Sequence, residues 1–360
     1  MDQAQSPDIS TELLEQNPLV ALAFFAFLML FATLAVGALS SWIWLITRTF
    51  QRKPVLVVEP WSPRVWGFVD LIFAAVIILF WQFQSAAAAS RLLGIKRHEL
   101  TDENNISLSV VALLGIGNLL AMASIILWIV VRHQATFAQI GFGVKKWGKH
   151  LGIGVVAAVA VLPLVYALMA AVSIGLDNTY SHPLLESMKR DGSLQAYLLA
   201  VVSAALIAPI VEEFLFRVLI QGWLQSWRGS SIKAILLGAS ESERAKQSHS
   251  FATQAPISFE VTDPLQAYAP VPASMDDDST TPKLESPPLW PAIVTGILFG
   301  LAHLGYGLSF IPLIVLGIIL GLLYRATHSI WPSLMVHFIL NSSSMIALGI
   351  GVLLESVAKK

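Results

Sequence analysis

The sequence predicts an all-α, polytopic membrane protein of about eight transmembrane helices with a polar cavity inside the membrane. Its 360 residues are 56% hydrophobic and only 12% charged, whereas a soluble domain carries about 25% charged residues. The mean hydropathy is +0.70. About eight apolar runs approach or exceed the ~20 residues that a helix needs to cross a bilayer. We therefore expect an integral multi-pass protein whose surroundings are membrane lipid.

The apolar runs divide the chain into two helical blocks. A polar tail, 1–17, precedes the first block, 18–176, which holds four predicted transmembrane helices. The second block, 195–354, holds the other four. The predicted spans are 18–47, 65–88, 107–131, 151–176, 196–225, 290–308, 309–325 and 331–354. The sixth and seventh are nearly continuous and are joined by "HLGYGLS", in which Gly305 and Gly307 permit a tight turn.

A polar insertion, 226–289, interrupts the second block. It is rich in Pro, Ser and Thr and contains the acidic run Asp276–Asp278. Such a segment buries too little apolar surface to fold, so we expect a disordered loop. Basic residues follow the first and third spans and are missing from the N-terminal tail, which predicts an external N-terminus and a cytoplasmic insertion.

Composition also excludes several classes of site. The chain has no cysteine, which removes disulfides, thiolate zinc sites and cysteine nucleophiles. The net charge is −1 and no basic cluster stands out, so we expect no nucleic-acid partner. The tail lacks the basic start of a signal peptide, and the first apolar run is too long for one, which predicts a retained span.

The stretch "APIVEEFLFRVL", Ala208–Leu219, places three charges inside an apolar span. Each charge at the centre of a membrane helix costs roughly 2.5–3.5 kcal/mol on insertion scales. Glu213 and Arg217 are four residues apart and can pair, whereas Glu212 points about 100° away around the helix. Pro209 is expected to kink the helix close to Glu212. The pattern predicts one paired and one unpaired glutamate.

Few other polar residues lie well inside the predicted spans: His303, His337, Asn341, Asp70 and Asn118. The last two have no obvious partner in the sequence. His337 and Asn341 are four residues apart and share one face of the eighth span. His303 follows Gly296 and Gly300 on one stripe, which permits close approach of a neighbouring helix.

Several kinds of site would use this polar set. A glutamate and a histidine can position and deprotonate a water for attack on a peptide carbonyl, and a second histidine with Asn341 can stabilise the oxyanion. Alternatively, Glu212, His303 and His337 can ligate a divalent metal such as zinc. A proton-coupled transporter, or a scaffold that uses buried pairs for packing, needs the same residue types.

Three motifs resemble those of the CPBP family: "EEFLFR" at 212–217, "FGLAH" at 299–303 and "HFILN" at 337–341. This family contains the CAAX prenyl endopeptidases of the second type and bacterial relatives often described as Abi proteins or intramembrane metalloproteases. All three motifs occur in order, over about 195–350. The resemblance identifies the second block as a CPBP-like peptidase core; its long insertion departs from the family pattern.

The resemblance implies a role for each motif residue. Glu212 matches the catalytic glutamate, and His303 matches its partner in activating water. His337 and Asn341 match the residues assigned to oxyanion stabilisation. Glu213, Arg217 and Phe299 match supporting positions.

We therefore expect an intramembrane endopeptidase, a hydrolase that acts in proteolysis on a membrane-associated protein or peptide. The implied location is a bacterial cell (inner) membrane. The alternatives are a non-catalytic immunity or scaffold protein and a proton-coupled transporter.

Overall fold

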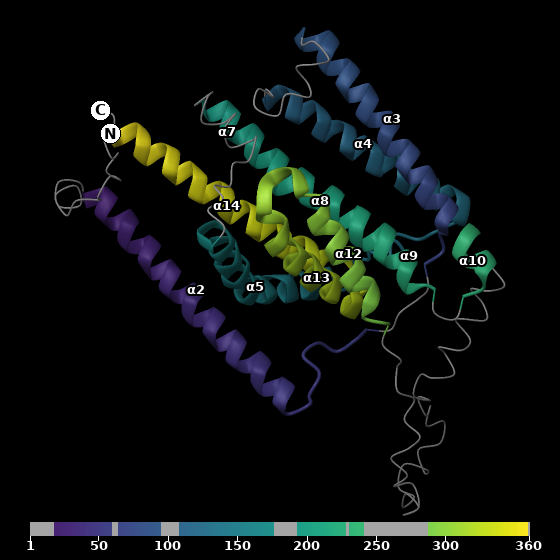
Figure 1. The fold of residues 1–360 in the computed structure, drawn as a ribbon, viewed down its shortest axis with the longest axis horizontal. Helices are drawn as coiled ribbons and strands as arrows, with labels where there is room; N and C mark the ends of the chain where they lie inside the picture. Colours follow the sequence, from purple (N-terminus) through teal and green to yellow (C-terminus); the bar gives the residue numbers. More distant parts are fainter. Residues whose placement is uncertain are drawn as a thin grey trace, which may run out of the picture.

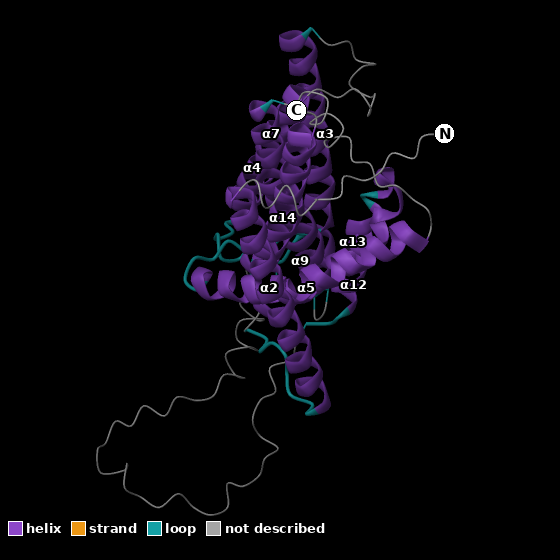
Figure 2. Ribbon diagram, turned by 90° about the vertical axis from the view of Figure 1, so that its left-hand side faces the viewer, coloured by secondary structure: helices purple, strands orange, loops and turns teal. Residues whose placement is uncertain are grey.

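The computed structural model describes residues 18–59, 64–94, 108–175, 193–227, 230–240 and 287–358. These residues form helices joined by loops, with no strand among them (Figure 2). The predicted all-α class is confirmed. Most of the polar insertion, including the acidic run Asp276–Asp278, lies outside the described residues, as does the N-terminal tail.

Among the described residues, six helical segments are long and apolar enough to cross a membrane: Phe68–Leu93, Leu108–His133, Trp147–Gly175, Leu194–Gln225, Gly307–Thr327 and Ile330–Ile350. The first three are α3, α4 and α5, and the last two contain α13 (Phe310–Thr327) and begin α14 (Ile330–Ala358). A further helix, α2 (Pro18–Phe50), is 33 residues long and packs against α5, where Trp42 Nε1 donates to Ala160 O at 3.2 Å.

Helices α2, α3, α4 and α14 run from upper left to lower right (Figure 1). α2 begins and α14 ends at the upper-left end, whereas the connections that leave α2, α4 and α9 (Gly222–Gln225) lie at the opposite end. That opposite end carries the basic residues on which the predicted orientation rests: Arg48, Arg52, Lys53, Arg64, Arg132, Lys145, Lys146 and Lys149. Its assignment to the cytoplasm stays a prediction.

The sixth predicted span, 290–308, is shorter in the structure. Helix α12 (Trp290–Leu301) has 12 residues, about 18 Å at 1.5 Å per residue, which is little more than half of a ~30 Å hydrocarbon core. The chain then turns through the 3₁₀ segment η4 (Leu304–Ser309) and returns as α13. Gly307 has φ +69° in this turn, a left-handed conformation that favours glycine. α12 and α13 therefore form a hairpin that enters and leaves from the same end.

Glycines hold the two arms of this hairpin together. A Cβ added to Gly296 would lie 2.4 Å from the backbone nitrogen of Ile318, and one added to Gly317 would lie 2.8 Å from Gly296 O. Neither position has room for a larger residue, because the backbones themselves are in contact. The predicted close approach along the glycine stripe is confirmed.

The fifth span is one continuous helix with changes of register. It consists of α7 (Leu194–Val201), η1 (Val202–Ile207), α8 (Ala208–Glu213), η2 (Phe214–Gln221) and α9 (Gly222–Gln225). η1 and η2 are π-helical, with wider turns than an α-helix. Such turns are rare and often occur at functional sites. The two glutamates end the α-helical turn between them.

Asp70 and Asn118 have partners that the sequence did not reveal. Asp70 caps α3 by accepting from Gly67 N at 2.9 Å, and it also accepts from Trp128 Nε1 at 3.0 Å. His133 Nε2 lies 2.9 Å from the same carboxylate. Asn118 Oδ1 accepts from Gln82 Nε2 across the α3–α4 pair. Both residues hold α3 and α4 together.

An ionic cluster at the basic end joins the segment after α2 to the start of α5. Glu59 contacts Lys146 Nζ and Lys149 Nζ, both at 3.0 Å, and His150 Nε2 at 3.3 Å. Burial by itself would raise the pKa of Glu59, but the hydrogen bonds from Lys146, Lys149 and His150 outweigh it and lower the pKa from 4.5 to about 2.

Acid should therefore weaken the fold through Glu59. A lowered carboxyl pKa contributes stability that is fully present above the unfolded-state value of 4.5 and is lost as the pH falls through the folded value of about 2. We expect the melting temperature of the detergent-solubilised protein to fall over this window, and to fall less steeply in Glu59→Gln. Parallel pH profiles of the two proteins would contradict this role for Glu59.

Candidate active site

Four of the motif residues, taken from three parts of the fold, carry the ionisable side chains that face one another. Glu212 and Glu213 end α8, His303 lies in the turn directly after α12, and His337 lies seven residues into α14. Because His337 lies so close to the start of α14, this helix must begin deep in the bundle for His337 to reach Glu212. The α13–α14 turn is indeed buried, since Ser329 and Ile330 are hardly exposed and Ile330 N donates to Gly141 O at 3.1 Å.

Both histidines direct Nε2 toward Glu212. His337 Nε2 lies 3.7 Å and His303 Nε2 lies 4.0 Å from Glu212 Oε2. The side chains are 27% exposed for Glu212, 19% for His303 and 4% for His337. Glu212 Oε2 is buried and has no hydrogen-bond partner among the described residues. The sequence prediction that Glu212 stands apart from the Glu213–Arg217 pair is confirmed.

The other ring nitrogen of each histidine is held by a hydrogen-bond acceptor. His303 Nδ1 lies 2.8 Å from Phe299 O, and His337 Nδ1 lies 3.1 Å from Glu213 Oε1. A carbonyl oxygen can only accept, and an ionised carboxylate likewise, so both Nδ1 atoms carry the proton. In the neutral rings Nε2 then presents a lone pair toward Glu212, and in a protonated ring it presents an N–H.

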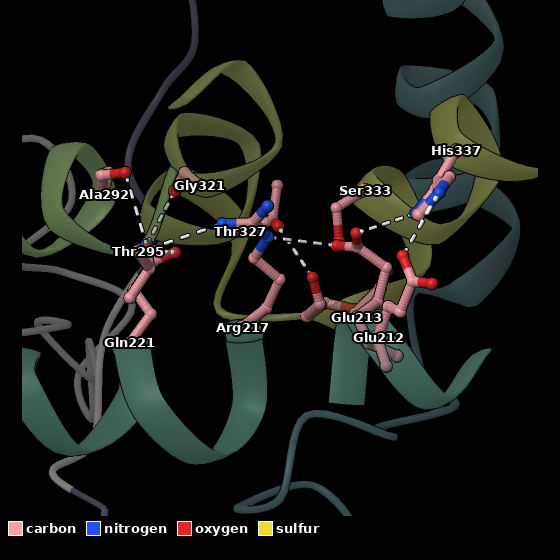
Figure 3. Close-up of polar contacts among 12 residues, drawn as sticks. Glu212, Glu213, Arg217, Gln221, Ala292, Thr295, Gly321, Thr327, Ser333 and His337 are labelled. Atoms are coloured by element: carbon pink, nitrogen blue, oxygen red, sulfur yellow. Dashed lines mark hydrogen bonds and ion pairs between the residues drawn. The ribbon is translucent and has the colours of Figure 1, made fainter. Parts of the chain in front are cut away.

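Glu213 is the hub of the buried charges (Figure 3). Its carboxylate accepts from Arg217 Nε at 3.2 Å as well as from His337, and neither Glu213 nor Arg217 is exposed. The i,i+4 pair predicted from the sequence is confirmed. The contact to His337 was not foreseen, since it crosses from one helix to another. Through it Glu213 orients the ring that faces Glu212.

Phe299 fills the space between these groups. Its ring is fully buried and lies 5.0 Å from the ring of His303, 5.5 Å from that of His337 and 5.3 Å from that of Phe216, between centroids. The Arg217 guanidinium carbon lies 5.5 Å from the Phe299 centroid, in a cation–π contact. Phe299 thus holds both histidines and the arginine in place.

Asn341 is engaged with the backbone of the glutamate helix. In η1 the Ala208 N–H bonds to Ser203 O, five residues back. The next donor in this register would be Pro209, which has no N–H, so Ala204 O lacks its helical partner. Asn341 Nδ2 donates to that oxygen at 2.8 Å. The structure therefore brings Asn341 next to the helix that carries Glu212, with its amide bound to Ala204.

Sequence reasoning missed the polar residues beyond Arg217. Gln221 and Gln225 continue the four-residue spacing that begins with Glu213 and Arg217, and all four side chains are fully buried. Four-residue steps drift by about 40° per step in an α-helix, and the wider π-helical turns of η2 reduce this drift. The repeated spacing in "EFLFRVLIQGWLQ" was the available signal.

The predicted metal ligands Glu212, His303 and His337 do not lie at the distances of a zinc site. Among the residues that the structure describes, no group of three or more His, Cys, Asp or Glu side chains could hold a metal ion. Glu212, His303 and His337 converge, but the 3.7 and 4.0 Å separations from Glu212 Oε2 exceed the ~3.3 Å expected between ligands that each lie ~2.0–2.1 Å from zinc.

Comparison with known proteins supports the resemblance of the motifs. The model of one family, described as Rce1-like, type II CAAX prenyl endopeptidase, matches residues 194–240 and 279–343. The unmatched stretch between these segments falls within the polar insertion. No curated protein and no solved structure matches the chain significantly. The two matched segments contain Glu212, Glu213, Arg217, Phe299, His303, His337 and Asn341. The helical core that holds the site is therefore similar to the Rce1-like type II CAAX prenyl endopeptidases, in agreement with the CPBP family that the three motifs resemble.

Proposed function

We propose that this protein is an intramembrane endopeptidase of the CAAX-protease type, in which Glu212 and His303 activate a water. The observation that carries the proposal is the convergence of His303 Nε2 and His337 Nε2 on Glu212 Oε2, an oxygen without a hydrogen-bond partner inside an apolar bundle. Separations of 3.7 to 4.0 Å are too long for direct hydrogen bonds and suit groups that share a water.

The residues divide the reaction between them. Glu212, assisted by His303, takes a proton from the water as its oxygen bonds to the peptide carbonyl carbon. His337, protonated and held by Glu213, donates its Nε2–H to the oxyanion. Collapse of the tetrahedral intermediate breaks the C–N bond, and the proton held by Glu212 passes to the leaving nitrogen. Arg217 balances the charge of Glu213 throughout.

A defined peptide and an unbiased survey together test this proposal. Purified full-length protein in detergent or liposomes should release the C-terminal tripeptide from a farnesylated, fluorogenic CAAX peptide, and Glu212→Gln should not. Membranes that contain the wild-type protein and the Glu212→Gln variant should also differ in an uncut protein or peptide, detected by comparative proteomics. Equal results for both proteins in both assays would leave a scaffold or transporter as the better explanation.

The role of a metal is tested by metal content. Because the direct Glu–His mechanism needs none, we expect purified protein to keep its activity after dialysis against a chelator. If Glu212, His303 and His337 instead ligate zinc, the protein should hold close to one equivalent, and a chelator should silence it reversibly. Elemental analysis measures the metal content, and the peptide assay measures the activity before and after chelation. Reversible loss of activity would overturn the metal-free mechanism.

A further inference from the structure

A second layer of buried polar contacts lies on the side of Arg217 that faces away from Glu212 (Figure 3). Arg217 Nη1 donates to Thr295 Oγ1 at 3.4 Å. The Thr295 hydroxyl proton faces both Pro291 O at 2.8 Å and Gln221 Oε1 at 3.3 Å. Gln221 Nε2 in turn donates to Gly321 O at 2.7 Å. Thr295 and Gln221 are fully buried, and no motif includes either of them.

These contacts join the two parts of the site that the sequence separates. Arg217 and Gln221 belong to η2, which directly follows Glu212 and Glu213. Thr295 lies on α12, two helical turns before His303, and Gly321 lies on the returning arm α13. The network therefore attaches the hairpin that holds His303 to the helix that holds Glu212.

The small residues around Gln221 show that the contact is closely fitted. A Cβ added to Gly321 would lie 3.0 Å from Gln221 Oε1 and from two atoms of Ala292. Glycine on α13 thus allows the carboxamide to reach the backbone carbonyl while α12 passes alongside. A displaced Gln221 would change the spacing of the hairpin as well as the contact to Thr295.

Arg217 depends on Thr295 for its orientation. Its Nε atom donates to Glu213 and its Nη1 atom donates to Thr295, while Nη2 is buried and has no partner within the part of the chain that the structure describes. A guanidinium is planar, so fixing two of its nitrogens fixes the plane. That plane sets the position of the Glu213 carboxylate, which holds His337 Nδ1.

We propose that Thr295 and Gln221 are positioning residues: through Arg217 and Glu213 they orient His337, and through Gly321 they fix the His303 hairpin against Glu212. This inference rests on the proposed function, because the geometry that they set is that of the hydrolytic site. Neither residue touches the reacting atoms, and their effect is on the alignment of the groups that do.

Substitutions that keep side-chain shape give the first test. Thr295→Val and Gln221→Met remove the polar contacts with little change in volume, and Thr295→Ser keeps the hydroxyl. For the farnesylated CAAX peptide we expect Thr295→Val and Gln221→Met to lower kcat by about 10- to 100-fold, as misalignment of catalytic groups does. KM should change little, and Thr295→Ser should retain most of the activity.

The matched control is Leu323→Ala, a buried apolar truncation on the same hairpin. It should lower thermal stability and leave kcat per folded molecule near that of the wild type. The proposal is wrong if Thr295→Val and Gln221→Met keep the wild-type kcat. It is also wrong if Leu323→Ala lowers kcat as much as they do, because the two residues would then have a structural role only. If Thr295→Val does not accumulate in the membrane, the kcat of Gln221→Met alone tests the proposal.

A second measurement needs no substrate. The chain has no cysteine, so spin labels can be placed uniquely at Leu301→Cys, at the end of α12, and at Leu206→Cys, in η1; these side chains are 39% and 43% exposed. The distribution of distances between the two spin labels should broaden or shift in Thr295→Val and Gln221→Met and stay unchanged in Leu323→Ala. Unchanged distances in all three would overturn the coupling. If the wild type does not cleave the peptide and the proteomic survey shows no uncut substrate for Glu212→Gln, the proposed function fails, while the interspin distances still test the coupling.

Discussion

Glu212→Gln should abolish peptide hydrolysis while leaving the protein folded and inserted. Loss of a general base costs about 10²- to 10⁴-fold in rate. Glutamine has nearly the shape of glutamate, and Glu212 has no direct hydrogen bond at Oε2 whose loss would destabilise the fold. Its side chain is also 27% exposed, so the neutral amide replaces a charge that is only partly desolvated. The measurements are the rate on the farnesylated CAAX peptide and the melting temperature of the same preparation.

Glu59→Gln is the control for this substitution, since it removes a glutamate from the ionic cluster at the basic end and leaves the site intact. It should cleave at the wild-type rate at neutral pH. Near-wild-type cleavage by Glu212→Gln would show that another group is the base. A large fall in its melting temperature would show that Glu212 holds the bundle together instead.

Glu213→Ala should have the largest effect on stability. Removing one partner of a buried ion pair leaves the other charge uncompensated, which costs about 3–5 kcal/mol. Here Arg217 and His337 would both lose their acceptor, and neither has appreciable exposure. We expect a marked loss of protein in the membrane fraction and a lower melting temperature in whatever remains, measured by immunoblot and thermal unfolding.

A double variant separates stability from catalysis at this position. Glu213→Leu with Arg217→Met replaces both charges by apolar side chains, and such replacements are often neutral or stabilising. We expect it to recover the amount of protein and to stay inactive, because His337 Nδ1 no longer has its carboxylate. Recovery of cleavage in this variant would contradict the proposed orientation of His337 by Glu213.

The sequence predicted those features that follow from local spacing. The Glu213–Arg217 pair and the glycine stripe of α12 depend on residues one turn apart, and both are confirmed. The apolar runs located the helices for the same reason. The grouping of Glu212, His303 and His337, which are far apart in the chain, was predicted from the resemblance of the three motifs to a family. Spacing alone cannot show which helices are neighbours.

What the sequence did not predict depends on contacts between helices. The side-chain partners Trp128 and His133 of Asp70 lie on α4, and the partner of Asn341 is a carbonyl freed by Pro209 within a π-helical register. The shortness of α12 could not be judged from hydropathy, because "HLGYGLS" continues the apolar run after the helix has ended. Thr295 was overlooked because a single hydroxyl in an apolar helix has many trivial explanations.

The separation of Glu212 from the two histidines has a consequence for synthesis of the protein. The polar insertion and α12 place about 90 residues between Glu212 and His303. At a translation rate of about 5–20 residues per second, Glu212 is added to the chain roughly 5–18 s before His303. In the proposed mechanism, the newly made chain holds its general base without His303 during that interval and cannot yet cleave other membrane proteins. Cleavage then begins only after the α12–α13 hairpin and α14 have inserted, so the order of the motifs delays the proposed activity until all three motifs have been made.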